Sequence, residues 1–174
     1  MFDKEYLFKG THAAKVIKLT AKFDDSNALF NRNLDVYLMA PIVGFLYQTK
    51  ADINNEDGKT TKIFPDQLIK NKEDLSFNYQ LIMLLDKNNA SDINDRLDKA
   101  FRYFDTDKAA EDEKLYNQYV LGGVDVLYEK LIENAHEPAD YLRNLYDFMD
   151  ELNTRYCESF DLNNITELCR LAKR

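Results

Sequence analysis

The ionisable side chains of this chain include one pair whose spacing is used by metal-binding helices. Glu133 and His136 stand three residues apart, and on a helix this spacing puts a carboxylate and an imidazole on one face, as in di-iron bundles. Such bundles need a second motif of the same kind and two further glutamates. The only other histidine is His12, and no Glu lies three residues before it. The pattern therefore favours a polar helix end with His136 near the negative pole of the helix dipole, and we expect no metal.

Residues 86–94 have the acidic and amide side chains of a calcium loop, but their spacing does not fit one. An EF-hand loop that begins at Asp86 needs Gly at its sixth position and Glu at its twelfth. Ser91 and Leu97 occupy those positions. The segment instead predicts a turn followed by a helix whose N-cap is Ser91.

Two aspartates, Asp35 and Asp125, lie inside apolar helical segments. A buried carboxylate costs several kcal/mol unless it is paired or protonated, so each aspartate could mark a site. Together with Glu133 and His136 they form the candidate polar site of this sequence. The alternative is that each aspartate faces water or meets a basic side chain such as Arg32.

Nucleophilic and phosphate-binding chemistry have little support. No histidine lies near Cys157 in the sequence, which leaves few ways to build a cysteine–histidine pair. The pair Gly122 and Gly123 is not surrounded by a phosphate-binding pattern. The two glycines indicate either a break between two helices or a close approach of two backbones that only a bare Cα permits.

The elements that must position these side chains are predicted to be helices. The chain has 5 Gly and 3 Pro among 174 residues, so the turn-formers of β proteins are scarce. Apolar residues recur at spacings of three and four, which is typical of amphipathic helices. We expect an all-α protein: one domain over residues 1–174, built as a compact bundle of about six or seven helices. The segment near residues 33–51 is apolar nearly all round and should be the buried central helix.

Several segments carry more specific expectations. Residues 1–9 should be extended or frayed, a first helix should end near Phe23, and residues 52–61 should form an exposed loop. Residues 75–85 predict a helix, with a strand as the alternative. A helix over residues 108–134 should be interrupted at Gly122 and Gly123. Residues 142–156 show the clearest amphipathic spacing, and a last short helix should follow Asn163 or Asn164.

Composition and charge bound the function classes. A hydrophobic fraction of 45 % with 31 % charged residues suits a soluble globular protein. The longest apolar stretch is too short to span a bilayer, no secretory signal opens the chain, and its two cysteines fit a reducing compartment, so we expect a cytoplasmic protein. The Asn- and Lys-rich composition resembles that of proteins from AT-rich bacteria, so we expect a bacterial source. The first 87 residues hold 12 basic and 12 acidic residues and the remaining 87 hold 11 and 19, so the net charge of −8 comes from the second half. This acidity opposes direct nucleic-acid binding.

The function favoured by the sequence is protein interaction. With few histidines and no catalytic motif or cofactor signature, we expect a non-enzymatic accessory or regulatory subunit, or a homo-oligomer, that binds through an acidic, aromatic-rich helical surface. Aromatic residues supply much of the binding energy of protein interfaces. Tyrosines punctuate the acidic half and are the candidate contact residues: Tyr116, Tyr119, Tyr128, Tyr141 and Tyr146. Two alternatives remain, an acidic mimic of nucleic acid that occupies the basic groove of another protein and an enzyme that uses only carboxylates.

Overall fold

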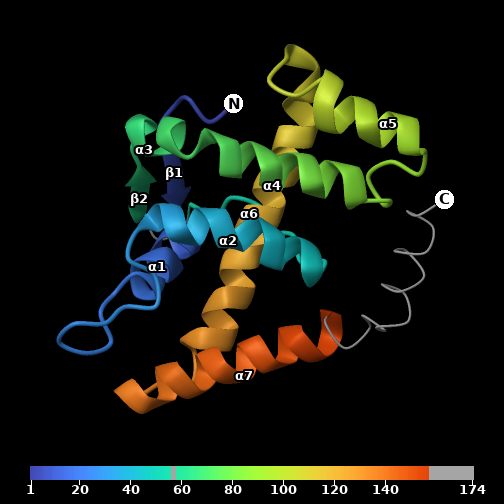
Figure 1. Cartoon of the computed structure of the whole chain (residues 1–174). Coiled ribbons are helices and arrows are strands. Elements are labelled where there is room, and N and C mark those ends of the chain that lie inside the picture. The colour runs from blue at the N-terminus through green and yellow to red at the C-terminus, as the bar shows by residue number, and fades with distance from the viewer. Residues whose placement is uncertain (56–57, 157–174) are drawn as a thin grey trace.

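The computed structural model describes residues 1–55 and 58–156. Cys157, Cys169 and the expected last helix lie outside the described residues. Within the described part, the expected all-α class is confirmed, since the fold consists of seven α-helices with one small two-stranded sheet at its edge (Figure 1). The elements follow in the order β1 (Tyr6–Lys9), α1 (Gly10–Leu19), α2 (Asn33–Leu46), β2 (Thr60–Ile63), α3 (Pro65–Lys70), α4 (Lys72–Leu85), α5 (Ile93–Leu97), the π-helical turn η1 (Asp98–Arg102), the 3-10 turn η2 (Asp107–Ala109), α6 (Ala110–Leu131) and α7 (Pro138–Tyr156).

The centre of the fold is a crossing of α2 and α6 in which the two backbones touch. A Cβ atom on Gly123 would lie 1.8 Å from the carbonyl oxygen of Ala40, and one on Gly44 would lie 2.1 Å from the carbonyl oxygen of Tyr119. Neither separation is possible for real atoms, so only glycine fits at these two positions. The close-approach interpretation of Gly122 and Gly123 is confirmed. The helix break is not, because α6 continues through both glycines.

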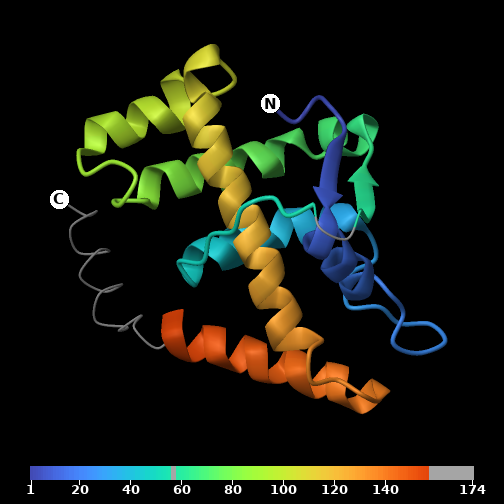
Figure 2. The same cartoon turned by 180° about the vertical axis from the view of Figure 1, so that it is seen from behind.

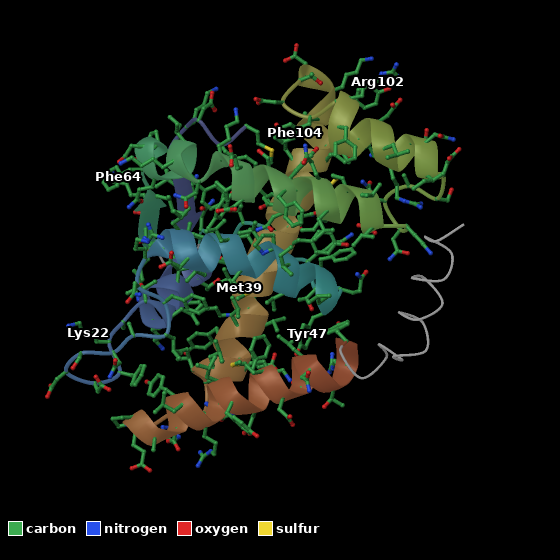
Figure 3. All side chains as sticks on the ribbon, viewed as in Figure 1. Lys22, Met39, Tyr47, Phe64, Arg102 and Phe104 are labelled. Atoms are coloured by element: carbon green, nitrogen blue, oxygen red, sulfur yellow. The ribbon has the colours of Figure 1, made fainter. Side chains whose placement is uncertain are left out.

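The other elements pack around this crossing. The views from the front and from behind show α6 as a long helix that passes α4 and α2 and reaches α7 at its far end (Figures 1 and 2). β1 pairs antiparallel with β2, with Phe8 opposite Thr61. Phe8 and Tyr37 bring these strands and α2 into one buried cluster with Tyr79 of α4 and Tyr116 of α6. At the other end, Tyr47 stacks on Phe148 of α7 with ring centroids 6.3 Å apart, and Figure 3 shows Tyr47 at this junction.

Some expected boundaries were wrong. The sheet was not expected, and β2 begins inside the segment assigned to an exposed loop. The first helix ends at Leu19 rather than near Phe23, and the central helix ends at Leu46. Residues 75–85 belong to a helix, so the strand alternative is excluded. The N-cap of α5 is Asp92, whose side chain accepts a hydrogen bond from the Asn94 N–H, and not Ser91.

The close contact at the crossing predicts that Gly123→Ala destabilises the protein, whereas Gly→Ala in an ordinary helix stabilises it. In an ordinary helix Gly→Ala stabilises by about 1 kcal/mol, but the alanine methyl at position 123 would overlap the Ala40 carbonyl. We expect Gly123→Ala to lower the free energy of unfolding by about 3 kcal/mol, as overpacking does. The measurement is urea unfolding followed by circular dichroism. The control is Gly58→Asn, at a position with open space and a positive φ that asparagine tolerates. Stabilisation by Gly123→Ala would contradict the close contact.

Candidate functional site

The four residues of the candidate polar site have separate partners. Asp35 lies at the N-terminus of α2, where its carboxylate accepts from the Arg32 guanidinium at 2.6 Å and from the Arg32 backbone N–H at 3.0 Å. This reciprocal contact caps the helix. The alternative that Asp35 meets Arg32 is therefore confirmed, and the aspartate has a structural role.

Asp125 belongs to a polar contact between α6 and α1. Its Oδ1 lies 2.8 Å from Lys15 Nζ and 3.3 Å from Nε2 of the buried His12. Burial alone would raise the pKa of Asp125, but the nearby His12 and Lys15 outweigh burial, and the pKa lies below its ordinary value. The charged form of Asp125 therefore helps to hold α1 against α6.

Glu133 and His136 are not on a helix. Both side chains are exposed and follow the end of α6 at Leu131, so the expected shared helix face does not form. The backbone N–H of His136 donates instead to the Asp140 carboxylate at 2.9 Å, which caps the start of α7. No group of three or more His, Cys, Asp or Glu side chains in the described part of the chain is arranged to hold a metal ion.

The five candidate tyrosines have very different environments. Tyr116 and Tyr119 are fully buried, so the prediction that they contact a partner is not compatible with this structure. Tyr128 is half-buried and accepts a hydrogen bond from Lys18 Nζ at 3.0 Å, and Tyr141 stacks on Phe23. Tyr146, on the outer side of α7, is 70 % exposed. Tyrosines in an acidic segment therefore do not define one surface here.

Tyr119 has a buried carboxylate as its partner. Its hydroxyl donates to Asp86 Oδ2 at 2.8 Å, and both side chains are buried. The other Asp86 oxygen accepts from the backbone N–H groups of Asn88 and Asn89, which forms the turn after α4. Burial raises the pKa of the Tyr119 hydroxyl and the hydrogen bond to Asp86 raises it further, so the tyrosine stays a donor.

The same region holds two buried or half-buried cations that fix the hairpin of α4, α5 and η1. Arg96 donates to the carbonyl oxygens of Leu84, Ala90 and Ser91 at 2.7–2.9 Å. Lys99 Nζ lies 2.6 Å from Oδ1 of the buried Asp112 on α6. These contacts satisfy the polar groups of the turn and tie the hairpin to α6, so its orientation is specified.

The outer side of this hairpin carries a row of exposed apolar side chains, which we call the hairpin face. It consists of Phe77, Leu85, Ile93, Leu97 and Phe101, each between 41 and 62 % exposed. Residues 77 and 85 are eight apart on α4, with half-buried Leu81 between them. Residues 93, 97 and 101 follow at a spacing of four along α5 and η1, and such spacings place side chains on one side of a helix.

The side chains of the hairpin face lie outside the sides of α4 and of α5 with η1 that contact the rest of the fold. Tyr79 and Met83 occupy the opposite side of α4 and are buried. On α5 and η1, Lys99 reaches Asp112 of α6 and Arg96 reaches the Leu84 carbonyl of α4, which leaves the side of Leu97 toward solvent. Figures 1 and 2 show α4 and α5 side by side and antiparallel. The face therefore gathers exposed apolar side chains on two helices that pack against each other, and exposed apolar surface of this kind marks interaction sites.

Unpaired acidic side chains surround the hairpin face. Four exposed carboxylates near the starts of α4 and α5 form no ion pair with any described residue: Glu73, Asp74, Asp92 and Asp95. The bases of the hairpin are largely engaged, since Lys72 pairs with Asp105, Lys99 with Asp112 and Arg102 with Asp98. Among the exposed bases of this region, Lys87 in the hairpin and Lys70 just before α4 form no ion pair in the described part of the chain. The surroundings of the face are thus negative.

Sequence reasoning did not find the hairpin face. The spacing of apolar residues identifies a helix face but does not tell whether that face is covered. The signal that could have revealed it is an excess of apolar positions. On α4, the buried Leu75, Tyr79, Ile82 and Met83 already supply a full core-facing stripe, so Phe77 lies outside it.

The comparisons with known proteins gave no relative. No family model matches the sequence, and neither the curated proteins nor the solved structures that were searched contain a match. Among the described helices, none combines the length and the apolar character that crossing a bilayer requires.

The contact between Tyr119 and Asp86 predicts a loss of stability when only one oxygen atom is removed. Tyr119→Phe keeps the ring and takes away the donor, so a buried carboxylate loses a hydrogen bond. We expect the free energy of unfolding to fall by about 2 kcal/mol. The same substitution at the exposed Tyr146 is the matched control and should change it by less than about 0.5 kcal/mol. Equal effects in urea unfolding would show that the buried pair contributes nothing.

The pair formed by Asp125 with His12 and Lys15 predicts a pH dependence. Because the folded pKa of Asp125 is lowered, its contribution is complete above the unfolded value of about 3.9 and is lost as the pH falls through the folded pKa. Asp125→Asn should therefore destabilise by about 1 kcal/mol at neutral pH, and its deficit should shrink between about pH 4 and pH 2. Urea unfolding at a series of pH values measures this. Asp147→Asn is the control, since Asp147 is exposed and forms no ion pair with any described residue. A deficit of Asp125→Asn that stays constant with pH would contradict this role of Asp125.

Proposed function

We propose that this chain is a cytoplasmic, non-enzymatic accessory or regulatory protein whose hairpin face binds a basic amphipathic helix of a partner protein. The observation that carries the proposal is the exposure of five large apolar side chains on two adjacent helices that are held rigidly on α6. Covering a half-exposed apolar side chain contributes roughly 1 kcal/mol. Phe77 and Phe101 are the expected anchors, because aromatic side chains dominate interface energetics.

The shape and charge of the face support a helical, basic occupant. An amphipathic helix presents anchors at spacings of three and four, and such a stripe can lie on the rows formed by the hairpin. Lys or Arg beside that stripe would meet the carboxylates of Glu73, Asp74, Asp92 and Asp95. Complementary charge mainly speeds encounter and selects the partner, while the apolar contacts hold it. The interaction function expected from the sequence is kept, but it moves from the tyrosines of the acidic half to the hairpin.

A model peptide tests this proposal directly. The probe is a roughly 18-residue helix with Leu on one face and Lys beside it, and its partner probe replaces every Lys by Glu. We expect the Lys helix to bind with micromolar affinity in fluorescence anisotropy, and the Glu helix to bind at least about tenfold more weakly. The double variant Phe77→Ser and Phe101→Ser should weaken the Lys helix by about tenfold or more without changing the circular dichroism spectrum.

A matched variant controls for loss of apolar surface in general. Leu142 and Met149 on the outer side of α7 are as exposed as the hairpin residues, so Leu142→Ser with Met149→Ser should leave peptide binding unchanged. Equal losses in both double variants, or no binding by the wild type, would contradict the proposal. Sedimentation that shows a dimer disrupted only by the hairpin variant would assign the face to a second copy. Binding of a basic protein that falls steeply with salt but ignores the hairpin variant would favour the nucleic-acid mimic.

The cellular partner is identified by cross-linking from the same face. A photoreactive amino acid in place of Leu97 should capture a partner at a basic helical segment, and the same group in place of Tyr146 should not. A cross-link to a segment without basic residues would exclude the stated partner chemistry.

A further inference from the structure

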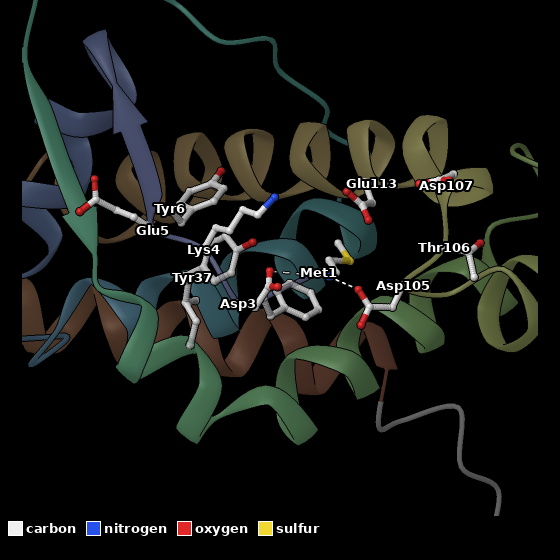
Figure 4. A pocket seen from close by; sticks show the side chains of 12 residues that line it. Met1, Asp3, Lys4, Glu5, Tyr6, Tyr37, Asp105, Thr106, Asp107 and Glu113 are labelled. Carbon is white, nitrogen blue, oxygen red and sulfur yellow. Dashed lines mark hydrogen bonds and ion pairs between the residues drawn. The ribbon is translucent and has the colours of Figure 1, made fainter.

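A cavity of about 440 Å³ lies near the N-terminal segment, and its lining shares no residue with the hairpin face. Figure 4 shows side chains from the N-terminal segment, from the loop before η2, and from α2 and α6 around it. A volume of this size suits a small organic molecule. Part of its wall is aromatic, formed by Phe2, Tyr6 and Tyr37.

Tyr37 is the most informative residue of this cavity. Its side chain is only 3 % exposed, and it borders the cavity. The ring is fixed by Tyr6, at a centroid distance of 4.3 Å, and by Phe2 at 6.5 Å. Its hydroxyl makes no hydrogen bond within residues 1–55 and 58–156, although Figure 4 shows it directed among the lining side chains. A hydroxyl without a protein partner can form a hydrogen bond with a group that enters the cavity.

The charge of the cavity is negative. Five carboxylates border it: Asp3, Glu5, Asp105, Asp107 and Glu113. The amino group of Met1 pairs with Asp105 and with Asp3, which lies 4.0 Å away. Lys72 also pairs with Asp105, and Lys62 pairs with Glu5 at 3.1 Å. Asp107 and Glu113 form no ion pair in the described part of the chain, and neither does Lys4, which also lines the cavity. Two free carboxylates therefore stand against one free ammonium group.

Glu113 lies where its charge acts on Tyr37. Burial raises the pKa of the Tyr37 hydroxyl, and the neighbouring Tyr116, Tyr6 and Glu113 raise it further. The carboxylate of Glu113 and the hydroxyl of Tyr37 therefore border the same cavity. Both can accept hydrogen bonds from an N–H group, and the aromatic wall beside them attracts positive charge.

We propose that this cavity binds a small organic ammonium ion. Glu113 is the counter-ion of the bound ammonium group, and the Tyr37 hydroxyl accepts a hydrogen bond from one N–H of that group. The aromatic wall of Phe2 and Tyr6 contacts the charged end of the ligand. Lys4 opposes this binding because it brings a like charge to the cavity. Removing the charge of Glu113 should therefore weaken binding of the ammonium ion, and removing the charge of Lys4 should strengthen it. A purely structural role of either residue would not produce this pair of opposite effects.

The experiment uses 1,4-diaminobutane as the probe and isothermal titration calorimetry on the full chain at low salt. We expect saturable binding that Glu113→Gln weakens by about tenfold, while Glu111→Gln leaves it unchanged, since Glu111 lies outside the cavity lining on the same helix. Tyr37→Phe should weaken binding by about threefold, and Lys4→Gln should strengthen it by about threefold. The uncharged analogue 1,4-butanediol should not bind.

Three results would overturn the proposal. They are no saturable heat up to about 10 mM diamine, equal effects of the substitutions at Glu111 and Glu113, and weaker binding by Lys4→Gln. Glu113 makes no ion pair in the described chain, so its glutamine variant is expected to fold, and an unchanged circular dichroism spectrum checks this. None of these variants alters the hairpin face, so this site and the proposed function can fail separately.

Discussion

The contact between the backbones of α2 and α6 is the constraint on which the remaining structure depends. At the crossing, Gly44 and Gly123 bring one helix against carbonyl oxygens of the other, at separations that leave no room for a methyl group. Gly122 similarly faces the carbonyl oxygen of Thr49. Such an approach fixes the position of both helices along their axes, because a shift of one residue would put a side chain into the contact. The helix α6 has 22 residues and is about 33 Å long. Its contact with α2 therefore also sets the positions of the other elements that pack on α6.

Polar contacts then attach three outer parts of the fold to α6 at different levels. Asp112 holds the hairpin through Lys99, Tyr119 holds the turn after α4 through Asp86, and Asp125 holds α1 through Lys15. Each of these pairs is buried or half-buried, so removing one partner costs more than the pair itself contributes. This arrangement leaves the outer side of the hairpin uncovered but rigid. An apolar surface on a rigid support loses little conformational entropy when a partner binds, which favours its use as a docking site.

The helical class and the central position of the segment near residues 33–51 could be predicted from the sequence, because apolar spacing and scarce turn-formers report directly on local structure. The close approach at Gly122 and Gly123 could be named only as one of two interpretations, since the partner backbone comes from a distant segment. The pairing of β1 with β2 joins residues more than fifty positions apart and leaves almost no local pattern. The burial of the tyrosines could not be predicted from local sequence either. Tyr119 and Tyr146 both belong to the acidic second half of the chain, and this shared charge does not tell that one lies in the core and the other in solvent.

Native-state hydrogen exchange tests the central role of the crossing most directly. We expect the amides of α2 and α6 around Gly44 and Gly123 to exchange only when the whole chain unfolds, with the largest opening free energies in the protein. The amides of α4 and α5 should open at lower free energy, in a smaller unit that leaves the crossing intact. If the crossing opens at a lower free energy than the hairpin, the two helices do not form the frame of this fold and the account is wrong.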